Sequence, residues 1–177
     1  MYERGVAQTG LTDVTAATGT SKSQLYQHFP DKEALVREVV AYRARVVLDH
    51  QHRRLQRLDS LRGLERWRDG LVERNRLRNG AYGCLLGSLA AELADQDEGT
   101  RLELARHFDA WRRLLVEGLE RMRANGTLRA DADAEALATG LLAAVQGGYL
   151  LAQTVRDVDR MEVALDMAIS HVRTFAV

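Results

Sequence analysis

The chain has 177 residues, and its 25 basic and 25 acidic side chains give a formal net charge of zero, so charge alone indicates no nucleic-acid partner. Hydrophobic residues make up 46% of the chain, enough for a buried core, and the single cysteine excludes an internal disulfide and fits a reducing compartment. The sequence shows no signal peptide and no apolar run of 18 or more residues, so we expect a cytoplasmic protein without a membrane partner.

The first informative segment, residues 9–19, predicts a short helix. Leu11, Val14 and Ala17 follow helical spacing and are expected to face inward. Gly19 stands where the end of a helix favours a residue in the left-handed conformation, so it is the expected C-cap.

A second short helix follows, with both a start and a stop signal. Ser21 and Gln24 have the spacing of a capping box, in which each side chain bonds a backbone N–H at the helix start. Pro30 disfavours helical geometry at the residue before it and ends the helix. Leu25 and Phe29 can anchor one face in a core. The opposite face carries Lys22, Ser23, Gln24, Gln27 and His28, with Tyr26 at its edge. Two short helices joined by a glycine-containing turn form the helix-turn-helix pattern of DNA readers, with two solvated helices of an ordinary bundle as the alternative.

Three segments of this region resemble the DNA-binding domain of tetracycline-repressor-family transcription factors: Tyr2–Gly5, Leu11–Gly19 and Ser21–Leu35. The resemblance is most specific at Leu25–Phe29, followed by Lys32. Family members begin with most of a helix before this point, of which only Met1–Arg4 is expected here, so the start of the chain is either truncated or short. The resemblance implies an all-α fold, with a helix-turn-helix DNA-binding domain at residues 1–45 and a helical ligand-binding and dimerisation domain at residues 46–177.

The resemblance also implies roles for individual side chains. Those at positions that mostly touch phosphates are Lys22, Tyr26, His28 and Lys32, and those that face base edges are Ser23, Gln24 and Gln27, joined by Thr12. Gln24 is the best candidate for a specific contact, because a glutamine amide can bond adenine N6 and N7 together. Its alternative role is that of an exposed capping partner of Ser21. A homodimer would place two such helices in successive major grooves of a near-palindromic operator.

Capping and breaker residues divide the rest of the chain into six further helices. They are expected at residues 32–58, 61–78, 83–94, 100–124, 134–155 and 159–176, the fourth of them opened by a capping box of Thr100 and Glu103. In the first of these, Leu35, Val39, Tyr42 and Val46 predict one inward face, and Val36, Val40 and Val47 a second. With Met1–Arg4 counted, nine helical segments and no strand signal predict an all-α protein.

The larger part of the chain is expected to hold a ligand cavity, since its large apolar and amphipathic side chains lie on helices that can face one another. The candidates are Trp67, Leu71, Leu85, Leu89, Phe108, Trp111, Leu115 and Tyr149, with Gln146 as a polar partner. Each of them can instead belong to an ordinary core. The segment 83–94 resembles a subgroup related to multidrug- and flavonoid-responsive repressors. Cys84 within it is either a buried inert thiol or an electrophile sensor.

The last two helices are the predicted dimer interface, because the body has more apolar helix faces than one subunit can hide. The residues assigned to this interface are Leu141, Ala144, Val145, Gly148, Ala152, Leu165, Ile169 and Val172. The alternative is that they form the core of a single subunit.

Catalytic, metal and cofactor sites are not expected. The five histidines show no metal-ligand spacing with the cysteine, and no phosphate-binding loop or nucleophile elbow is present. The sequence therefore predicts a transcriptional regulator, a repressor that a small apolar or aromatic molecule releases from its operator. The alternatives are a thiol-based electrophile sensor acting through Cys84 and a binding scaffold that no longer reads DNA.

Overall fold

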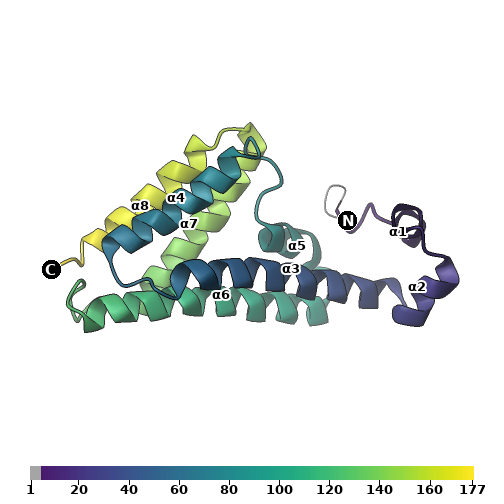
Figure 1. Ribbon diagram of the computed structural model, residues 1–177, viewed down its shortest axis with the longest axis horizontal. Helices are drawn as coiled ribbons and strands as arrows, with labels where there is room; N and C mark the ends of the chain where they lie inside the picture. Colours follow the sequence, from purple (N-terminus) through teal and green to yellow (C-terminus); the bar gives the residue numbers. More distant parts are fainter. Residues whose placement is uncertain (1–4) are drawn as a thin grey trace. The chain divides into compact units, whose positions relative to one another are not determined.

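The computed structural model describes residues 5–177, and this part of the chain is all-α, with the eight helices shown in Figure 1. They are α1 (Leu11–Thr18), α2 (Lys22–His28), α3 (Lys32–Leu55), α4 (Leu61–Arg76), α5 (Leu85–Leu93), α6 (Glu98–Ala124), α7 (Ala134–Val155) and α8 (Asp159–Arg173). The predicted fold class is confirmed. The ninth predicted helical segment, Met1–Arg4, lies outside the described residues.

The chain forms two compact units, each built from two separate segments. The head unit contains Met1–Val47 and Leu85–Arg106, and the body unit contains Leu48–Cys84 and His107–Val177. Helices α3 and α6 therefore contribute one part to each unit. The predicted functional boundary at residue 45 stays a prediction, and the structure adds α5 and the first turns of α6 to the unit that contains the N-terminal helices.

In the head unit, local signals define the two short helices. Gly19 ends α1 in the left-handed conformation, with φ of 70°, as predicted. No α1 residue is fully buried: Leu11 and Val14 are half-buried and Ala17 is exposed. The inward orientation predicted for Ala17 is wrong, because no described element covers that end of the helix.

Helix α2 begins and ends where its sequence predicts. The Gln24 backbone N–H donates to Ser21 Oγ (3.1 Å), and the Ser21 N–H donates to Gln24 Oε1 (2.8 Å), which completes the capping box. Phe29 is extended, with φ of −132° and ψ of 110°, as expected for a residue before proline. Leu25 is the one buried residue of α2, so this side chain anchors the helix in the head unit.

The two predicted faces of α3 are each confirmed in part. On the first, Leu35 is buried and Val39 half-buried, but Tyr42 and Val46 are 61% and 42% exposed. On the second, Val36 and Val40 are buried and Val47 is half-buried. With about 100° of rotation per residue, Tyr42 lies about 200° around the helix from Val40 and so faces the opposite side. The prediction that Tyr42 and Val46 face inward is therefore wrong, whereas the start of the first face, at Leu35, packs together with the second.

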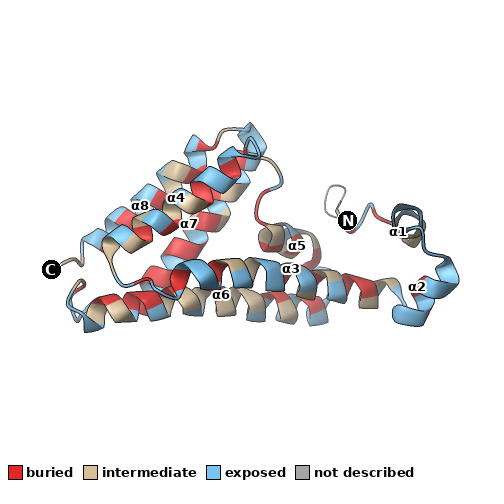
Figure 2. Ribbon diagram, in the orientation of Figure 1, coloured by how far each residue is buried: buried red, intermediate tan, exposed pale blue. Residues whose placement is uncertain are grey.

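In the body unit, α8 packs against α7 and α4, and Figure 2 shows their buried faces. The Ser60 side chain caps α4 by accepting from the Gly63 N–H (3.2 Å), as predicted. Gly148 allows the close approach of α7 to α8, because a Cβ at this position would lie 3.0 Å from the Met161 Cα. Between α4 and α8, Arg68 forms an ion pair with Glu162 at 3.0 Å.

Two further details differ from prediction. Helix α6 begins at Glu98, before the predicted capping box, because the Asp97 carboxylate accepts from the Thr100 N–H (2.6 Å) and supplies the cap. No apolar segment of membrane length was expected. Among residues 5–177, however, α7 is long and apolar enough to cross a membrane, judged by length and composition alone. The core helix of a soluble protein can meet the same two criteria.

Candidate functional site

The polar face of α2 is presented outward, as the sequence predicts. Lys22, Ser23, Gln24, Gln27 and His28 are exposed, Tyr26 is 50% exposed, Thr12 of α1 is exposed, and Lys32 at the start of α3 is half-buried. Because Leu25 is buried on the other side, the packing of α2 fixes which face is free. The free face offers hydroxyl, amide, imidazole and ammonium groups, the side chains that contact base edges and phosphates.

The capping box limits what Gln24 can do. Its Oε1 accepts from the Ser21 N–H, so the capping role that competed with base reading is present in the structure. Bidentate contact with adenine needs both the oxygen and the nitrogen of the amide. Ser23 and Gln27 make no hydrogen bond within the described chain, so their side chains are available without breaking a local contact.

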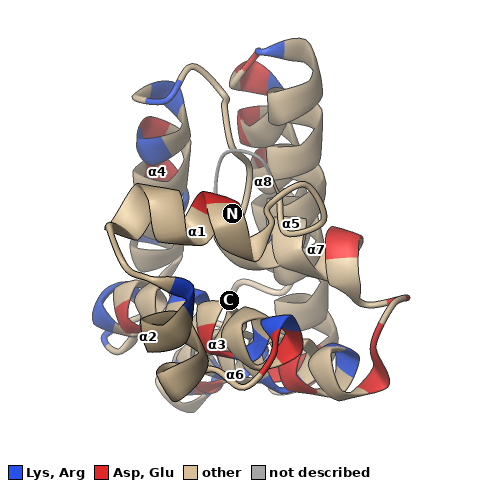
Figure 3. Cartoon of the chain, turned by 90° about the vertical axis from the view of Figure 1, so that its right-hand side faces the viewer, with Lys and Arg blue, Asp and Glu red and all other residues tan. Residues whose placement is uncertain are grey.

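Helices α1 and α2 carry little charge, as Figure 3 shows. Helix α1 contains one charged residue, Asp13, and α2 contains one, Lys22. Lys32 adds a second cation at the start of α3. The exposed side chains of α2 are therefore mainly neutral hydrogen-bonding groups.

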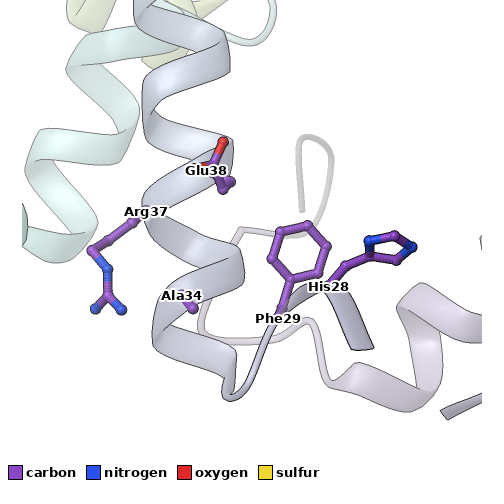
Figure 4. A pocket seen from close by; sticks show the side chains of 5 residues that line it. All are labelled: His28, Phe29, Ala34, Arg37 and Glu38. Atoms are coloured by element: carbon purple, nitrogen blue, oxygen red, sulfur yellow. The ribbon is translucent and has the colours of Figure 1, made fainter. Parts of the chain in front are cut away.

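A hollow of about 380 Å³ lies where α2 meets α3 and is lined by His28, Phe29, Ala34, Arg37 and Glu38 (Figure 4). The His28 and Phe29 rings are 6.4 Å apart, and in Figure 4 the Arg37 side chain extends away from them. None of the predicted ligand-binding residues lines it, and only His28 of the predicted DNA contacts does.

The predicted ligand-binding residues divide between the two units. Trp67, Leu71, Trp111 and Leu115 are buried in the body unit, where Cys84 is 7% exposed and Phe108, Gln146 and Tyr149 are half-buried. Leu85 and Leu89 belong to α5 of the head unit. A common pocket for all ten stays a prediction.

Two predicted pocket residues carry buried polar atoms that lack a partner within the described chain: Trp111 Nε1 and Gln146 Nε2. The second tryptophan differs, because Trp67 Nε1 donates to Gln51 Oε1 at 2.9 Å. A buried donor without an acceptor costs about 1–3 kcal/mol. These two N–H groups can therefore donate to an acceptor that the chain itself does not supply.

A polar cluster in the body unit was not predicted from the sequence. The Arg74 guanidinium donates to His50 Nδ1 at 3.0 Å, and burial followed by Arg74, Arg54 and Arg53 lowers the pKa of His50 to about 4. Burial, with a smaller effect of Cys84, raises the pKa of Tyr149 to about 12 against the opposing effect of nearby arginines. Five arginines, at positions 53, 54, 74, 76 and 78, are visible in the sequence with the pattern of solvated helix faces, and all five are exposed in the structure.

The residues predicted for the dimer interface lie mostly in the core of the single chain. Seven are buried, namely Leu141, Val145, Gly148, Ala152, Leu165, Ile169 and Val172, and Ala144 is half-buried. The structure thus places them where the alternative interpretation did, because α7 and α8 of one chain pack through this stripe. The exposed large apolar residues of the same two helices are Leu150, Leu151, Val155, Val163 and Met167.

The outer face of α7 is small and uncharged. Ala136, Gly140, Ala143 and Gly147 are all exposed and recur at spacings of three and four residues. A Cβ at Gly140 or Gly147 would meet no atom within 4 Å. Packing inside the chain therefore gives no reason for glycine at these two positions, although each glycine inside a helix costs about 0.8–1.0 kcal/mol relative to alanine.

Comparisons with known proteins agree with this architecture. Residues 1–39 match the family described as bacterial regulatory proteins of the tetR family, and residues 55–168 match the tetracyclin repressor-like C-terminal domain. The HTH-type transcriptional repressor DhaR of Mycobacterium sp. (strain GP1) is 29% identical over 157 residues, covering 84% of this chain and 74% of that protein.

Solved structures show the same fold. A TetR-family transcriptional regulator from Cytophaga hutchinsonii superimposes with a TM-score of 0.83 at 22% identity, over 98% of this chain and 88% of that one. A cysteine mutant of the TetR-family regulator CifR, complexed with 26 bp double-strand operator DNA, gives a TM-score of 0.80 at 25% identity, over 96% and 88% of the two chains. Members of this family bind DNA and are not enzymes. The chain belongs to the tetracycline-repressor family of DNA-binding transcriptional regulators.

Proposed function

We propose that the protein is a cytoplasmic homodimeric repressor, which a small apolar or aromatic molecule releases from a near-palindromic operator. The observation that carries the DNA-reading part is the free polar face of α2, held outward by the buried Leu25. Residues 1–45 would read the operator and residues 46–177 would bind the ligand and the second subunit. The relative DhaR is itself named a repressor, which supports repression rather than activation.

The contacts proposed for the operator follow from the family resemblance and from exposure, since all of these side chains are exposed except the half-buried Lys32. Ser23 and Gln27 read base edges from the free face of α2, with Thr12 beside them, and Gln24 contributes only when it gives up its contact with Ser21. Lys22, Tyr26, His28 and Lys32 contact phosphates on either side. One copy makes too few contacts for useful affinity, so two copies have to bind together.

The second subunit is proposed to dock on the outer face of α7 and α8. Leu150, Leu151, Val163 and Met167 are each more than half exposed, and Gly147 on the same helix leaves room for a close helix neighbour. Two copies of this face would form a four-helix interface related by a twofold axis, in which each residue set meets its own copy. The seven buried residues of the predicted interface then support this face from beneath.

The ligand is proposed to bind in the body unit near Trp111 and Gln146. Both side chains hold buried N–H groups that have no acceptor in the part of the chain that the structure describes, inside a unit rich in apolar side chains. Pockets for drug-sized molecules are mostly apolar with a few placed polar groups. Binding would lower operator affinity only to the extent that the ligand prefers the conformation that does not fit DNA.

The second candidate is a thiol-based sensor acting through Cys84. After burial, Cys84 is the next contributor to the raised pKa of Tyr149, so the two side chains are neighbours in the body unit. Its low exposure, 7%, works against direct attack on a dissolved electrophile. Cys84→Ser separates the two candidates: a sensor loses its response to electrophiles, whereas a repressor that binds its ligand reversibly keeps its response.

The proposed function is tested by selecting duplexes from a random DNA library with the full chain. We expect a near-palindrome whose half-sites are about 10–10.5 bp apart centre to centre, or a multiple of one helical turn. A selection that enriches no sequence would favour a scaffold that no longer reads DNA. Enrichment of an unsymmetrical single half-site would contradict the proposed dimer while leaving DNA binding intact.

A further inference from the structure

We propose that the body unit holds an anion subsite, formed by Arg54, Arg74 and His50 with Tyr149 beside it, which binds the carboxylate of a small organic acid. This inference rests on the proposed ligand response and names the chemical class of the effector. All four residues belong to the body unit and come from three helices, α3, α4 and α7.

One buried donor of this cluster, His50 Nε2, has no acceptor among residues 5–177. Arginine is always protonated, so Arg74 donates to His50 Nδ1 across 3.0 Å, and the neutral imidazole carries its proton on Nε2. That Nε2 is buried and has no partner within the described chain. Arg54 lies directly against the α4 backbone at Gly70, where a Cβ would be 1.4 Å from its Nη1. Any side chain at position 70 would therefore displace this guanidinium.

The cluster has an excess of positive charge. Within residues 5–177, no carboxylate lies at ion-pair distance from Arg54 or Arg74. The opposite is true of Arg68 on the same helix, which pairs with Glu162 at 3.0 Å and Asp166 at 3.3 Å. Arg54 and Arg74 are both exposed, and partial burial followed by the neighbouring arginines lowers the pKa of Arg74 against an opposing effect of Tyr149. A bound anion would relieve this repulsion.

The donors fit a planar carboxylate. Guanidinium groups bind carboxylates through paired N–H groups, and the raised pKa of Tyr149 keeps its hydroxyl protonated as a further donor. The ring of Trp67, whose N–H donates to Gln51, is fully buried and belongs to the core. The apolar body of the effector therefore comes from the proposed function, and the subsite adds a carboxylate to it.

The test is isothermal titration of the full chain with benzoate, benzamide and inorganic phosphate. Benzoate has an aromatic body and a carboxylate, benzamide has nearly the same shape without the charge, and phosphate has charge without the apolar body. We expect saturable binding of benzoate at one site per chain and no measurable binding of the other two. Arg54→Gln and Arg74→Gln are expected to weaken benzoate binding by about tenfold or more, because each removes a charge-assisted hydrogen bond.

The matched control is Arg66→Gln, on the exposed surface of α4 outside the cluster, which is expected to leave benzoate affinity unchanged. Absence of benzoate binding, equal binding of benzamide or phosphate, or an equal decrease in the Arg66 variant would each overturn the proposal. Operator binding, measured on the same preparations, separates the two claims. A chain that selects an operator but ignores benzoate is a regulator without this subsite, and a chain that binds benzoate but selects no DNA contradicts the proposed function.

Discussion

The outer face of α7 allows a sharp test of the proposed dimer through Gly147. In an isolated chain, Gly147→Ala is expected to raise stability by about 0.8–1.0 kcal/mol, since alanine favours the helix and the new Cβ meets no atom of the chain. In a dimer that packs helices closely here, the twofold axis introduces two methyl groups. Each is expected to cost about 1–3 kcal/mol by overpacking. The same substitution therefore has opposite effects on the monomer and on the dimer.

The assay combines sedimentation velocity with urea unfolding over a hundredfold range of protein concentration. We expect Gly147→Ala to raise the dimer dissociation constant by at least about tenfold, since about 1.4 kcal/mol corresponds to a factor of ten. Gly147→Glu is expected to give monomers, because it places two carboxylates opposite each other in the interface. Gln153→Glu, exposed on another side of α7, is the control and is expected to stay dimeric. A Gly147→Glu chain that sediments like the wild type at every concentration would refute the interface.

Three other predictions concern local contacts. Ser21→Ala is expected to destabilise the chain by about 1 kcal/mol in urea unfolding because it removes the α2 cap, and an unchanged midpoint would contradict this. Because the pKa of His50 is lowered in the folded chain, the unfolded chain binds a proton at His50 more readily. The contribution of the neutral His50 to the free energy of unfolding is therefore complete above pH 6.5 and disappears as the pH falls toward about 4. His50→Gln is expected to flatten that pH dependence, whereas His52→Gln, exposed on the same helix, is not. Glu92→Ala removes the acceptor of the Ala7 N–H (2.5 Å), so hydrogen exchange at Ala7 is expected to become faster, and unchanged exchange would count against this hydrogen bond.

The helix boundaries could be predicted because their signals are local. Ser21 with Gln24 and Ser60 occupy the cap positions that their sequence spacing indicates, and each makes the expected bond. Pro30 likewise forces the extended residue before it. The free polar face of α2 followed from the same local pattern, since a seven-residue helix with a single buried side chain leaves few orientations.

The assignment of faces on α7 could not be predicted in this way. This helix has apolar or small residues on more than one side, so periodicity did not distinguish the face that packs inside the chain from the face left outside. Gly148 is buried against Met161, whereas its neighbour Gly147 is exposed, and nothing in the sequence separates the two.

The polar cluster was missed for a related reason. His50, Arg74 and Tyr149 are far apart in the sequence, and only the packing of α3, α4 and α7 brings them together. Taken singly, an arginine on a helix is most simply explained as a solvated side chain.

The central claim, that α2 reads an operator, is tested most directly by the salt dependence of binding to the selected duplex in fluorescence-anisotropy titrations. Lys22→Ala removes one proposed phosphate contact per subunit, so the slope of log K against log salt is expected to become shallower by about 1.8 for a dimer, with weaker binding to operator and random DNA alike. Gln27→Ala is expected to weaken only the operator complex, by about 1–3 kcal/mol for each hydrogen-bonded base that the glutamine no longer reads. Arg66→Ala, on α4, serves as the control and is expected to change neither quantity. An unchanged slope in Lys22→Ala, together with equal operator binding in Gln27→Ala, would contradict the claim that α2 reads DNA.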